Sequence, residues 1–87
     1  MKSDFEVIYH PDVVAKDLPK ISHDIKERIR RSIEAKLTSA PEEFGDPLRR
    51  TLKGYWKLRV GDYRVIYKIA AKTVIVFRIG HRREIYD

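Results

Sequence analysis

Residues 52–67 read LKGYWKLRVGDYRVIY, and this stretch decides how the second half of the chain folds. Apolar and polar side chains alternate on both sides of Gly61-Asp62, which is typical of two strands joined by a tight turn. A glycine in the first position of a two-residue connection predicts a type II′ hairpin. We therefore expect paired strands over 55–60 and 63–69.

The alternation sorts the side chains of this hairpin onto two faces. One face is apolar and is expected to lie under the helices: Trp56, Leu58, Val60, Tyr63, Val65 and Tyr67. The other face carries four cations, Lys57, Arg59, Arg64 and Lys68, together with Tyr55 and Ile66. Arg59 and Arg64 stand directly opposite each other, where like charges repel. Folding does not require this pair, so the second face is expected to bind negative charge, and a solvated face of splayed side chains is the alternative.

The first half of the chain predicts one strand and two helices. Alternation over 5–9 indicates a strand, and a short helix is expected over 12–18, where Pro19 should end it. Ser22 is a plausible N-cap for a main helix over 23–37. Apolar residues recur there at every fourth position, which is a helical spacing. They are Ile21, Ile25, Ile29, Ile33 and Leu37.

The segment 38–54 has no sustained periodicity and contains two prolines and two glycines, so it is expected to be a loop. Its expected anchors on the body of the protein are Phe44, Leu48 and Leu52. A turn at 70–72 and a last strand over 73–79 complete the order β-α-α-β-β-β. This order predicts an α+β fold, with two N-terminal helices packed on a small, largely antiparallel twisted sheet.

The composition limits the class of protein. A chain of 87 residues has room for one domain, 1–87, and the absence of cysteine fits a reducing compartment. Neither a signal peptide nor a membrane span is evident, so a cytoplasmic protein is expected. Residues 1–43 hold eight basic and nine acidic side chains, whereas 44–87 hold eleven basic and four acidic ones. This asymmetry favours a polyanion, an acidic protein, or both as partners.

The end of the chain adds further candidates for chemistry on RNA. His81 is followed by Arg82, Arg83 and Tyr86. Cations around an aromatic ring suit single-stranded RNA, because phosphates and an unstacked base can both be held. Cleavage of RNA needs a base for the 2′-hydroxyl, a cation for the phosphorane and an acid for the leaving oxygen. The cations and His81 could supply these, and no metal-ligand spacing or cofactor motif is visible.

Two segments closely resemble the RelE/ParE superfamily of toxins. The hairpin segment 52–67 is similar to the central hairpin of that superfamily, and the ending Ile79-Gly80-His81-Arg82-Arg83-Glu84-Ile85-Tyr86 looks like that of its RelE branch. The resemblance covers essentially the whole chain. It implies the toxin of a type II toxin–antitoxin system, namely a ribosome-dependent endoribonuclease that cuts mRNA in the A site by attack of the 2′-hydroxyl, without a metal.

The resemblance also implies roles for individual residues. Lys57 would be the general base or a charge stabiliser, Arg64 would stabilise the phosphorane, and Arg82 would be the acid or a second phosphate contact. Tyr86 would stack on or orient the substrate base, and His81 is an alternative acid or base. The residues expected to bind RNA are Lys53, Arg59, Lys68 and Arg83.

The chain departs from the family pattern at two places, and other functions are possible for such a chain. Well-known members carry a second lysine where this chain has Tyr55, and the tail after Gly80 is shorter here. A ParE-like inhibitor of DNA gyrase without enzymatic activity is the main alternative, and a plain RNA-binding module is another. The expected partners are the ribosome and a small acidic antitoxin that wraps the toxin, with a hetero-tetramer as one form of that complex.

Overall fold

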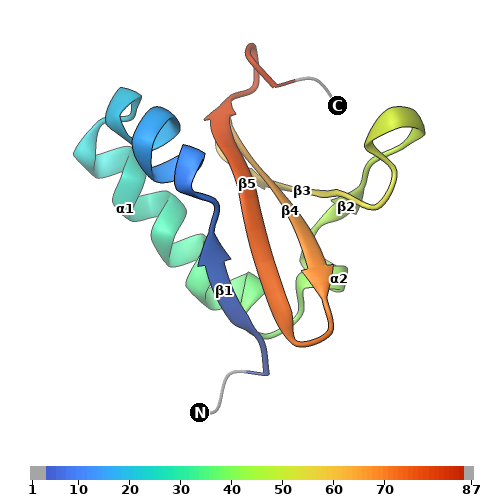
Figure 1. Cartoon of the computed structure of the whole chain (residues 1–87). Coiled ribbons are helices and arrows are strands. Elements are labelled where there is room, and N and C mark those ends of the chain that lie inside the picture. Colours follow the sequence, from blue (N-terminus) through green and yellow to red (C-terminus); the bar gives the residue numbers. More distant parts are fainter. Residues whose placement is uncertain (1–3, 86–87) are drawn as a thin grey trace.

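A five-stranded sheet forms the body of the protein in the computed structural model, which describes residues 4–85 (Figure 1). The strand order is β1-β5-β4-β3-β2, with β1 parallel to β5 and every other pair antiparallel. The predicted α+β class with a largely antiparallel sheet is confirmed. The strands are β1 (Glu6–Tyr9), β2 (Asp46–Pro47), β3 (Trp56–Val60), β4 (Tyr63–Ala70) and β5 (Thr73–His81).

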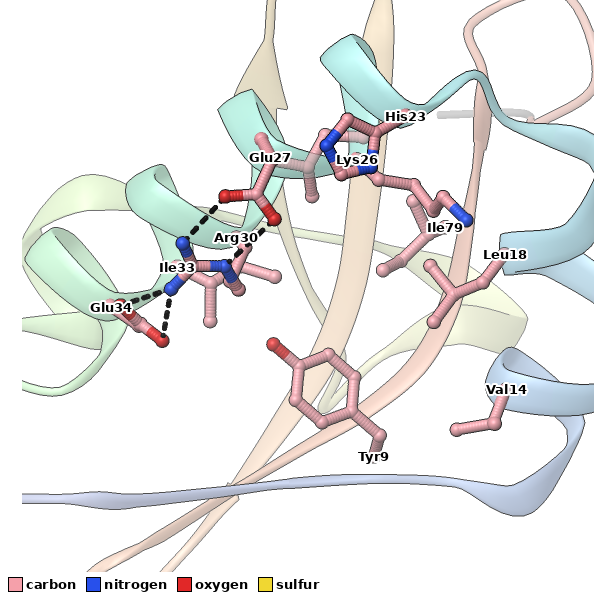
Figure 2. A pocket seen from close by; sticks show the side chains of 11 residues that line it. Tyr9, Val14, Leu18, His23, Lys26, Glu27, Arg30, Ile33, Glu34 and Ile79 are labelled. Carbon is pink, nitrogen blue, oxygen red and sulfur yellow. Dashed lines mark hydrogen bonds and ion pairs between the residues drawn. The ribbon is translucent and has the colours of Figure 1, made fainter.

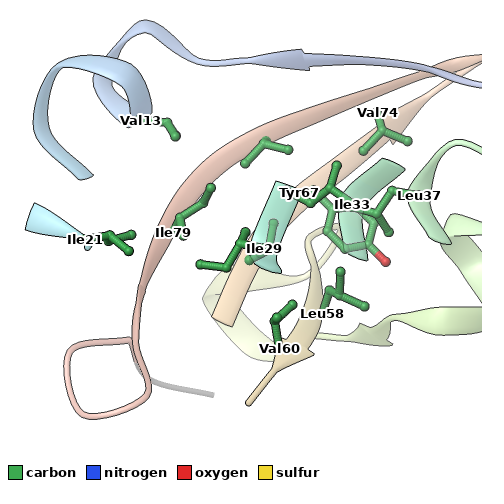
Figure 3. Packing of buried hydrophobic residues seen from close by; sticks show 12 residues of the cluster. Val13, Ile21, Ile29, Ile33, Leu37, Leu58, Val60, Tyr67, Val74 and Ile79 are labelled. Carbon is green, nitrogen blue, oxygen red and sulfur yellow. The ribbon is translucent and has the colours of Figure 1, made fainter. Parts of the chain in front are cut away.

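The helical segments cover one face of the sheet and bury the apolar stripe. The main helix runs as α1 (His23–Ser32) and continues as the π-helical η3 (Ile33–Leu37), so the helix expected over 23–37 is confirmed. Ile29, Ile33 and Leu37 are buried against the apolar face of the hairpin (Figure 3). The remaining helical segments are η1 (Val13–Asp17), η2 (Leu18–Lys20), α2 (Pro41–Phe44) and η4 (Arg50–Leu52).

The short helix expected over 12–18 is confirmed as η1, which ends at Asp17, and Pro19 lies in the 3₁₀ turn η2 that follows it. One local prediction is wrong. The segment expected to be a loop contains α2, β2 and η4, because even two residues of β2 can pair with β3. Of its three expected anchors only Leu48 is buried, whereas Phe44 and Leu52 are exposed.

The predicted hairpin register is confirmed from Trp56 to Tyr67. Val60 pairs with Tyr63, and Arg59 pairs with Arg64. Gly61 has φ +60°, the value that the first position of a type II′ turn requires. The apolar and cationic faces therefore lie as alternation predicts.

The end of β5 turns back over the cationic face of the sheet. The His81 carbonyl accepts hydrogen bonds from the N–H groups of Glu84 and Ile85, which forms a tight turn. The Ile85 side chain packs over Gly80, where an added Cβ would lie 3.0 Å from Ile85 Cδ1. Ile85 forms a second small buried cluster with Leu48 and Ile66. In Figure 1 this C-terminal turn and the loop after β2 lie away from α1.

Candidate functional site

Five cations project from the sheet face that the helices leave uncovered, and we call this surface the cationic face. Its members are Lys57, Arg59, Arg64, Lys68 and Arg78. Not one acidic residue occurs in β3, β4 or β5. Lys57 and Arg64 are only 5% and 9% exposed, whereas Arg59 is exposed. The site therefore has two cations that are mostly withdrawn from water and a rim of cations that is open to it.

Arg64 avoids its neighbour Arg59 by folding back toward the hairpin turn. Its Nη1 donates hydrogen bonds to the carbonyl oxygens of Gly61 (3.0 Å) and Tyr63 (2.9 Å). These bonds hold the guanidinium in one position. Its Nε is buried and has no hydrogen-bond partner among residues 4–85. A buried N–H without a partner is costly, so a bound anion would recover that free energy.

Lys57 lies beside a basic loop. It pairs across the strands with Asp46 and Ile66, and lines a hollow together with Pro47, Leu48, Arg49 and Arg50. Arg50 has φ +59°, a conformation that residues other than glycine seldom adopt. Lys57 and Arg64 are diagonal neighbours across β3 and β4, and such positions lie about 7–8 Å apart. Two long side chains at this spacing can reach one phosphate group.

The C-terminal turn brings Arg82 to the same end of the hairpin. Its backbone N–H donates a hydrogen bond to the Asp62 carbonyl (2.8 Å). Its side-chain Nε lies 3.8 Å from Asp62 Oδ1 in an exposed ion pair. Exposed pairs of this kind contribute little to stability, so Arg82 can exchange Asp62 for another anion. Arg83 is also exposed in this turn.

His81 lies on the opposite face of the sheet from Lys57 and Arg64. It pairs with Tyr63, and the two rings meet edge to face at 5.4 Å between centroids. Its Nδ1 accepts a hydrogen bond from the Arg83 N–H (3.2 Å). The structure thus does not bring His81 into the cationic face. Tyr86 lies outside the described residues, so its predicted role stays a prediction.

The remaining predicted RNA contacts lie near the start of β3. Lys53 is exposed, in the turn that leads into β3. Lys68 places its Nζ 4.9 Å from the centre of the Tyr55 ring. An ammonium group therefore lies next to the position where well-known family members carry a second lysine.

Sequence reasoning missed Arg78 and the pair Arg49-Arg50. A β-bulge shifts the register between β4 and β5, so that Ile66 faces Arg78 and Tyr67 faces Val76. Strict alternation from Val76 would place Arg78 in the core. The sequence contains a trace of this bulge. Val74 and Val76 are two positions apart, whereas the next buried residue, Ile79, follows after three. Arg49-Arg50 could have been found as a basic cluster close to Lys57 along the chain.

A second hollow, about 420 Å³ in volume, lies on the helical side of the sheet and is lined mainly by apolar atoms (Figure 2). The Tyr9 ring reaches from β1 toward α1, and burial together with the Glu34 carboxylate raises the pKa of its hydroxyl. Arg30 is bound there by Glu27 (2.6 Å) and Glu34 (3.0 Å), and its hydrogen bond lowers the pKa of the Glu27 carboxyl. Arg30 in this second hollow is therefore already neutralised by two carboxylates, which distinguishes it from the cations of the cationic face.

Residues 4–85 contain no group of three or more histidine, cysteine, aspartate or glutamate side chains arranged to hold a metal ion. No helix within the same range is long and apolar enough to cross a membrane.

Comparison with known proteins agrees with this geometry. Residues 7–86 match the family model described as ParE toxin of type II toxin–antitoxin system, parDE. Toxin RelG of Mycobacterium tuberculosis is 36% identical over 73 residues, which cover 82% of this chain and 84% of RelG.

Solved structures of toxin–antitoxin complexes are also similar. A chain of the RelBE2 complex from Mycobacterium tuberculosis superposes with a TM-score of 0.84 at 31% identity, covering 91% of this chain and 99% of that one. A chain of the RelB–RelE complex from Methanococcus jannaschii gives a TM-score of 0.70 at 29% identity, covering 92% and 95%. The protein therefore belongs to the RelE/ParE superfamily and is a toxin of a type II toxin–antitoxin system.

Proposed function

We propose that this toxin is a ribosome-dependent endoribonuclease that cleaves mRNA in the ribosomal A site without a metal ion. One observation carries the proposal. Arg64 holds a buried guanidinium in a fixed position on a face rich in cations, and its Nε–H lacks a partner within the described part of the chain. A preorganised donor in a site that largely excludes water is the arrangement that stabilises a developing negative charge.

The reaction is an attack of the ribose 2′-hydroxyl on the adjacent phosphate. The 2′-oxygen forms a bond to phosphorus while the bond to the 5′-oxygen breaks, which leaves a 2′,3′-cyclic phosphate and a free 5′-hydroxyl. Arg64 donates a guanidinium N–H to a non-bridging oxygen as charge accumulates on the phosphorane. Lys57 accepts the proton of the 2′-hydroxyl or stabilises the charge, and Arg82 acts as a second phosphate contact or as the acid.

His81 takes no part in this scheme, because it lies on the other face of the sheet. The rim cations Arg59, Lys68 and Arg83 bind phosphates of mRNA or ribosomal RNA, and Lys53 extends that rim. Tyr86 orients the substrate base. Such contacts weaken steeply with salt, since each phosphate that is neutralised releases counterions.

The regulatory partner in this proposal is a small acidic antitoxin. The similar RelBE2 and RelB–RelE structures are complexes of a toxin with an antitoxin. Residues 44–87 hold eleven basic and four acidic side chains, and an acidic chain that folds on contact complements that surface. We propose that the antitoxin covers the cationic face and so keeps the toxin inactive in the cytoplasm.

Inhibition of DNA gyrase by binding alone is the second candidate. It is favoured by the match of residues 7–86 to the ParE family model. The cationic face could bind another acidic surface without performing chemistry. The two candidates differ in whether mRNA is cut, so one assay of RNA integrity separates them.

Primer extension on a reporter mRNA in a cell-free translation reaction tests the proposal. Wild type is compared with Arg64→Ala and with Arg31→Ala, which removes an exposed arginine of α1 on the helical side. Circular dichroism verifies that each variant is folded. We expect cuts in translated mRNA with wild type and Arg31→Ala, and a loss of cuts with Arg64→Ala. Naked mRNA should stay intact.

The other outcomes are equally informative. Intact mRNA with all proteins, together with inhibition of gyrase supercoiling by wild type, would replace the nuclease by the gyrase inhibitor. Cuts in naked mRNA would keep the nuclease and remove the ribosome from the mechanism. Equal cutting by Arg64→Ala and wild type would show that the catalytic group lies elsewhere.

A further inference from the structure

Three aromatic rings form a row on the sheet face opposite α1, and the proposed cleavage chemistry uses none of them, although one, Tyr55, also packs against the small cluster of Leu48, Ile66 and Ile85. Phe77 lies between His10 and Tyr55, with 5.5 Å between ring centroids on each side. The interplanar angles are 34° to His10 and 72° to Tyr55. All three residues are partly exposed. We call His10, Phe77 and Tyr55 the aromatic row.

A β-bulge places two neighbouring side chains, Phe77 and Arg78, on this face. Because Ile66 faces Arg78 while Tyr67 faces Val76, Phe77 is the extra residue of β5. A bulge re-aims a side chain relative to strict alternation, and bulges are common near functional sites. The Phe77 ring meets Tyr55 rather than the core, and it belongs to neither of the two buried clusters.

The row continues the cationic face toward β1. Lys68 pairs with Ile75, and Ile75 pairs with Ile8, so these three side chains share one face. His10 follows β1 two residues after Ile8 and therefore points the same way. Lys68 lies over the Tyr55 ring at 4.9 Å, which joins the row directly to the cations.

The surroundings of the row favour a nucleic acid over an apolar peptide. Cations border it at Lys68 and Arg78, and β3, β4 and β5 lack acidic residues. A single-stranded nucleic acid presents both a ring to stack and a phosphate for each nucleotide. Proteins that bind such strands combine aromatic rings with a basic groove. An apolar peptide would use the rings but would offer no negative charge to Lys68 and Arg78.

We propose that the aromatic row stacks unpaired bases of single-stranded RNA whose phosphates bind the cationic face. The proposal deepens the proposed function and rests on RNA being the ligand of this face. In this proposal the aromatic row holds the RNA beside the cleavage site. The bases of the RNA lie toward β1, and its phosphates lie toward Lys57 and Arg64. The rings act as positioning residues, because the reacting phosphate lies among the cations.

Binding of two synthetic strands tests this inference. The first is a 2′-O-methyl RNA of eight nucleotides, which cannot be cleaved by 2′-hydroxyl attack. The second has the same backbone but abasic residues at its four central positions. Fluorescence anisotropy at low salt measures both affinities. Stacking of bases on aromatic rings adds to the affinity for a strand, so wild type should bind the strand with bases about tenfold more tightly than the abasic strand.

The variants separate the rings from the charges. Phe77→Leu and Tyr55→Leu should each reduce the preference for bases several-fold and leave the affinity for the abasic strand nearly unchanged. Phe44→Leu is the matched control, because Phe44 is also exposed with a lysine, Lys36, 5.7 Å from its ring centre. It should behave as wild type. Thermal unfolding verifies the fold, and Tyr55→Leu carries the test if Phe77→Leu does not fold.

Each outcome decides whether the aromatic row binds bases of RNA or another ligand. Equal affinity for both strands, or no binding of either, would overturn the aromatic row as a base platform and leave an apolar peptide as its occupant. If that happens while Arg64 is still required for cleavage in translation reactions, only this inference fails. A clear preference for bases without any cleavage would instead overturn the proposed nuclease alone.

Discussion

Arg64 is the residue on which the chemistry of the cationic face depends. The residue is only 9% exposed, and two carbonyl oxygens fix the position of its guanidinium through Nη1. Desolvation strengthens its interaction with any anion that reaches Nε, because the local dielectric constant is lower than that of water. The cost of burying this charge was met during folding. The two Nη1 bonds therefore fix the guanidinium before a substrate arrives, whereas Nε has to be uncovered before it can meet an anion.

Tyr67 leads to a prediction about stability at alkaline pH. Its hydroxyl donates to the Pro41 carbonyl (2.6 Å), and burial, followed by the Asp46 charge, raises its pKa above the usual value near 10. The unfolded chain ionises this tyrosine first. The neutral hydroxyl therefore contributes its full share of the free energy of unfolding below pH 10, and this contribution is lost as the pH rises above 10. The free energy of unfolding should fall by up to about 1.4 kcal/mol per pH unit above 10.

Urea unfolding between pH 8 and pH 11 measures this effect. Tyr67→Phe should be less stable than wild type at pH 8, because the hydrogen bond to Pro41 is lost. The difference between the two proteins should shrink as the pH rises above 10. A difference that stays constant up to pH 11 would contradict the raised pKa of Tyr67.

At single residues, sequence reasoning succeeded where a short turn sets the register. The two-residue connection at Gly61-Asp62 leaves one way to pair β3 with β4, so the faces of Lys57, Arg59 and Arg64 could be predicted. The face of His81 could not, because it depends on pairing at the far end of β5, beyond the bulge. The burial of Lys57 and Arg64 could not be predicted either, since it depends on contacts made by segments distant in sequence.

Among the elements, the turn between β4 and β5 contains a strained residue. Ala71 has φ +55°, where an L-residue with a Cβ is disfavoured by about 1–2 kcal/mol. Ala71→Gly removes that strain, although glycine adds entropy to the unfolded chain. We expect a net gain in stability of about 0.5–1 kcal/mol.

Thermal unfolding of Ala71→Gly measures that gain as a rise in Tm of a few degrees. Ala70→Gly is the matched control, because Ala70 is still paired with Thr73 in the ladder. Glycine within a strand should lower stability by about 0.5–1 kcal/mol. A fall in Tm for both variants would show that the turn at Ala71 is not strained.

The elements that sequence reasoning missed are short ones. β2 is a strand of two residues, and η2 is a single turn of three, so neither carries a periodic signal. The long stripe of α1 and η3 was predictable because four apolar residues, Ile25, Ile29, Ile33 and Leu37, repeat its period. Bulges and short edge strands arise from pairing with neighbours, and their physical cause is therefore outside the segment itself.

At the scale of the whole molecule, the sheet separates two surfaces of different character. The helical side buries the main core and carries carboxylates that neutralise Arg30. The uncovered side carries five cations on strands that have no acidic residue. The charge asymmetry between the halves of the sequence becomes an asymmetry between two faces, because β3, β4 and β5 all come from the second half.

The most direct measurement is the single-turnover rate of mRNA cleavage on purified ribosomes with a defined codon in the A site. Wild type, Arg64→Ala and Arg31→Ala are compared at saturating toxin, where weaker binding no longer limits the rate. Loss of one preorganised donor to a transition-state oxyanion costs about 100–1,000-fold in rate. We therefore predict that decrease for Arg64→Ala and an unchanged rate for Arg31→Ala. Equal rates for Arg64→Ala and wild type would contradict the assignment of Arg64 as the group that stabilises the phosphorane.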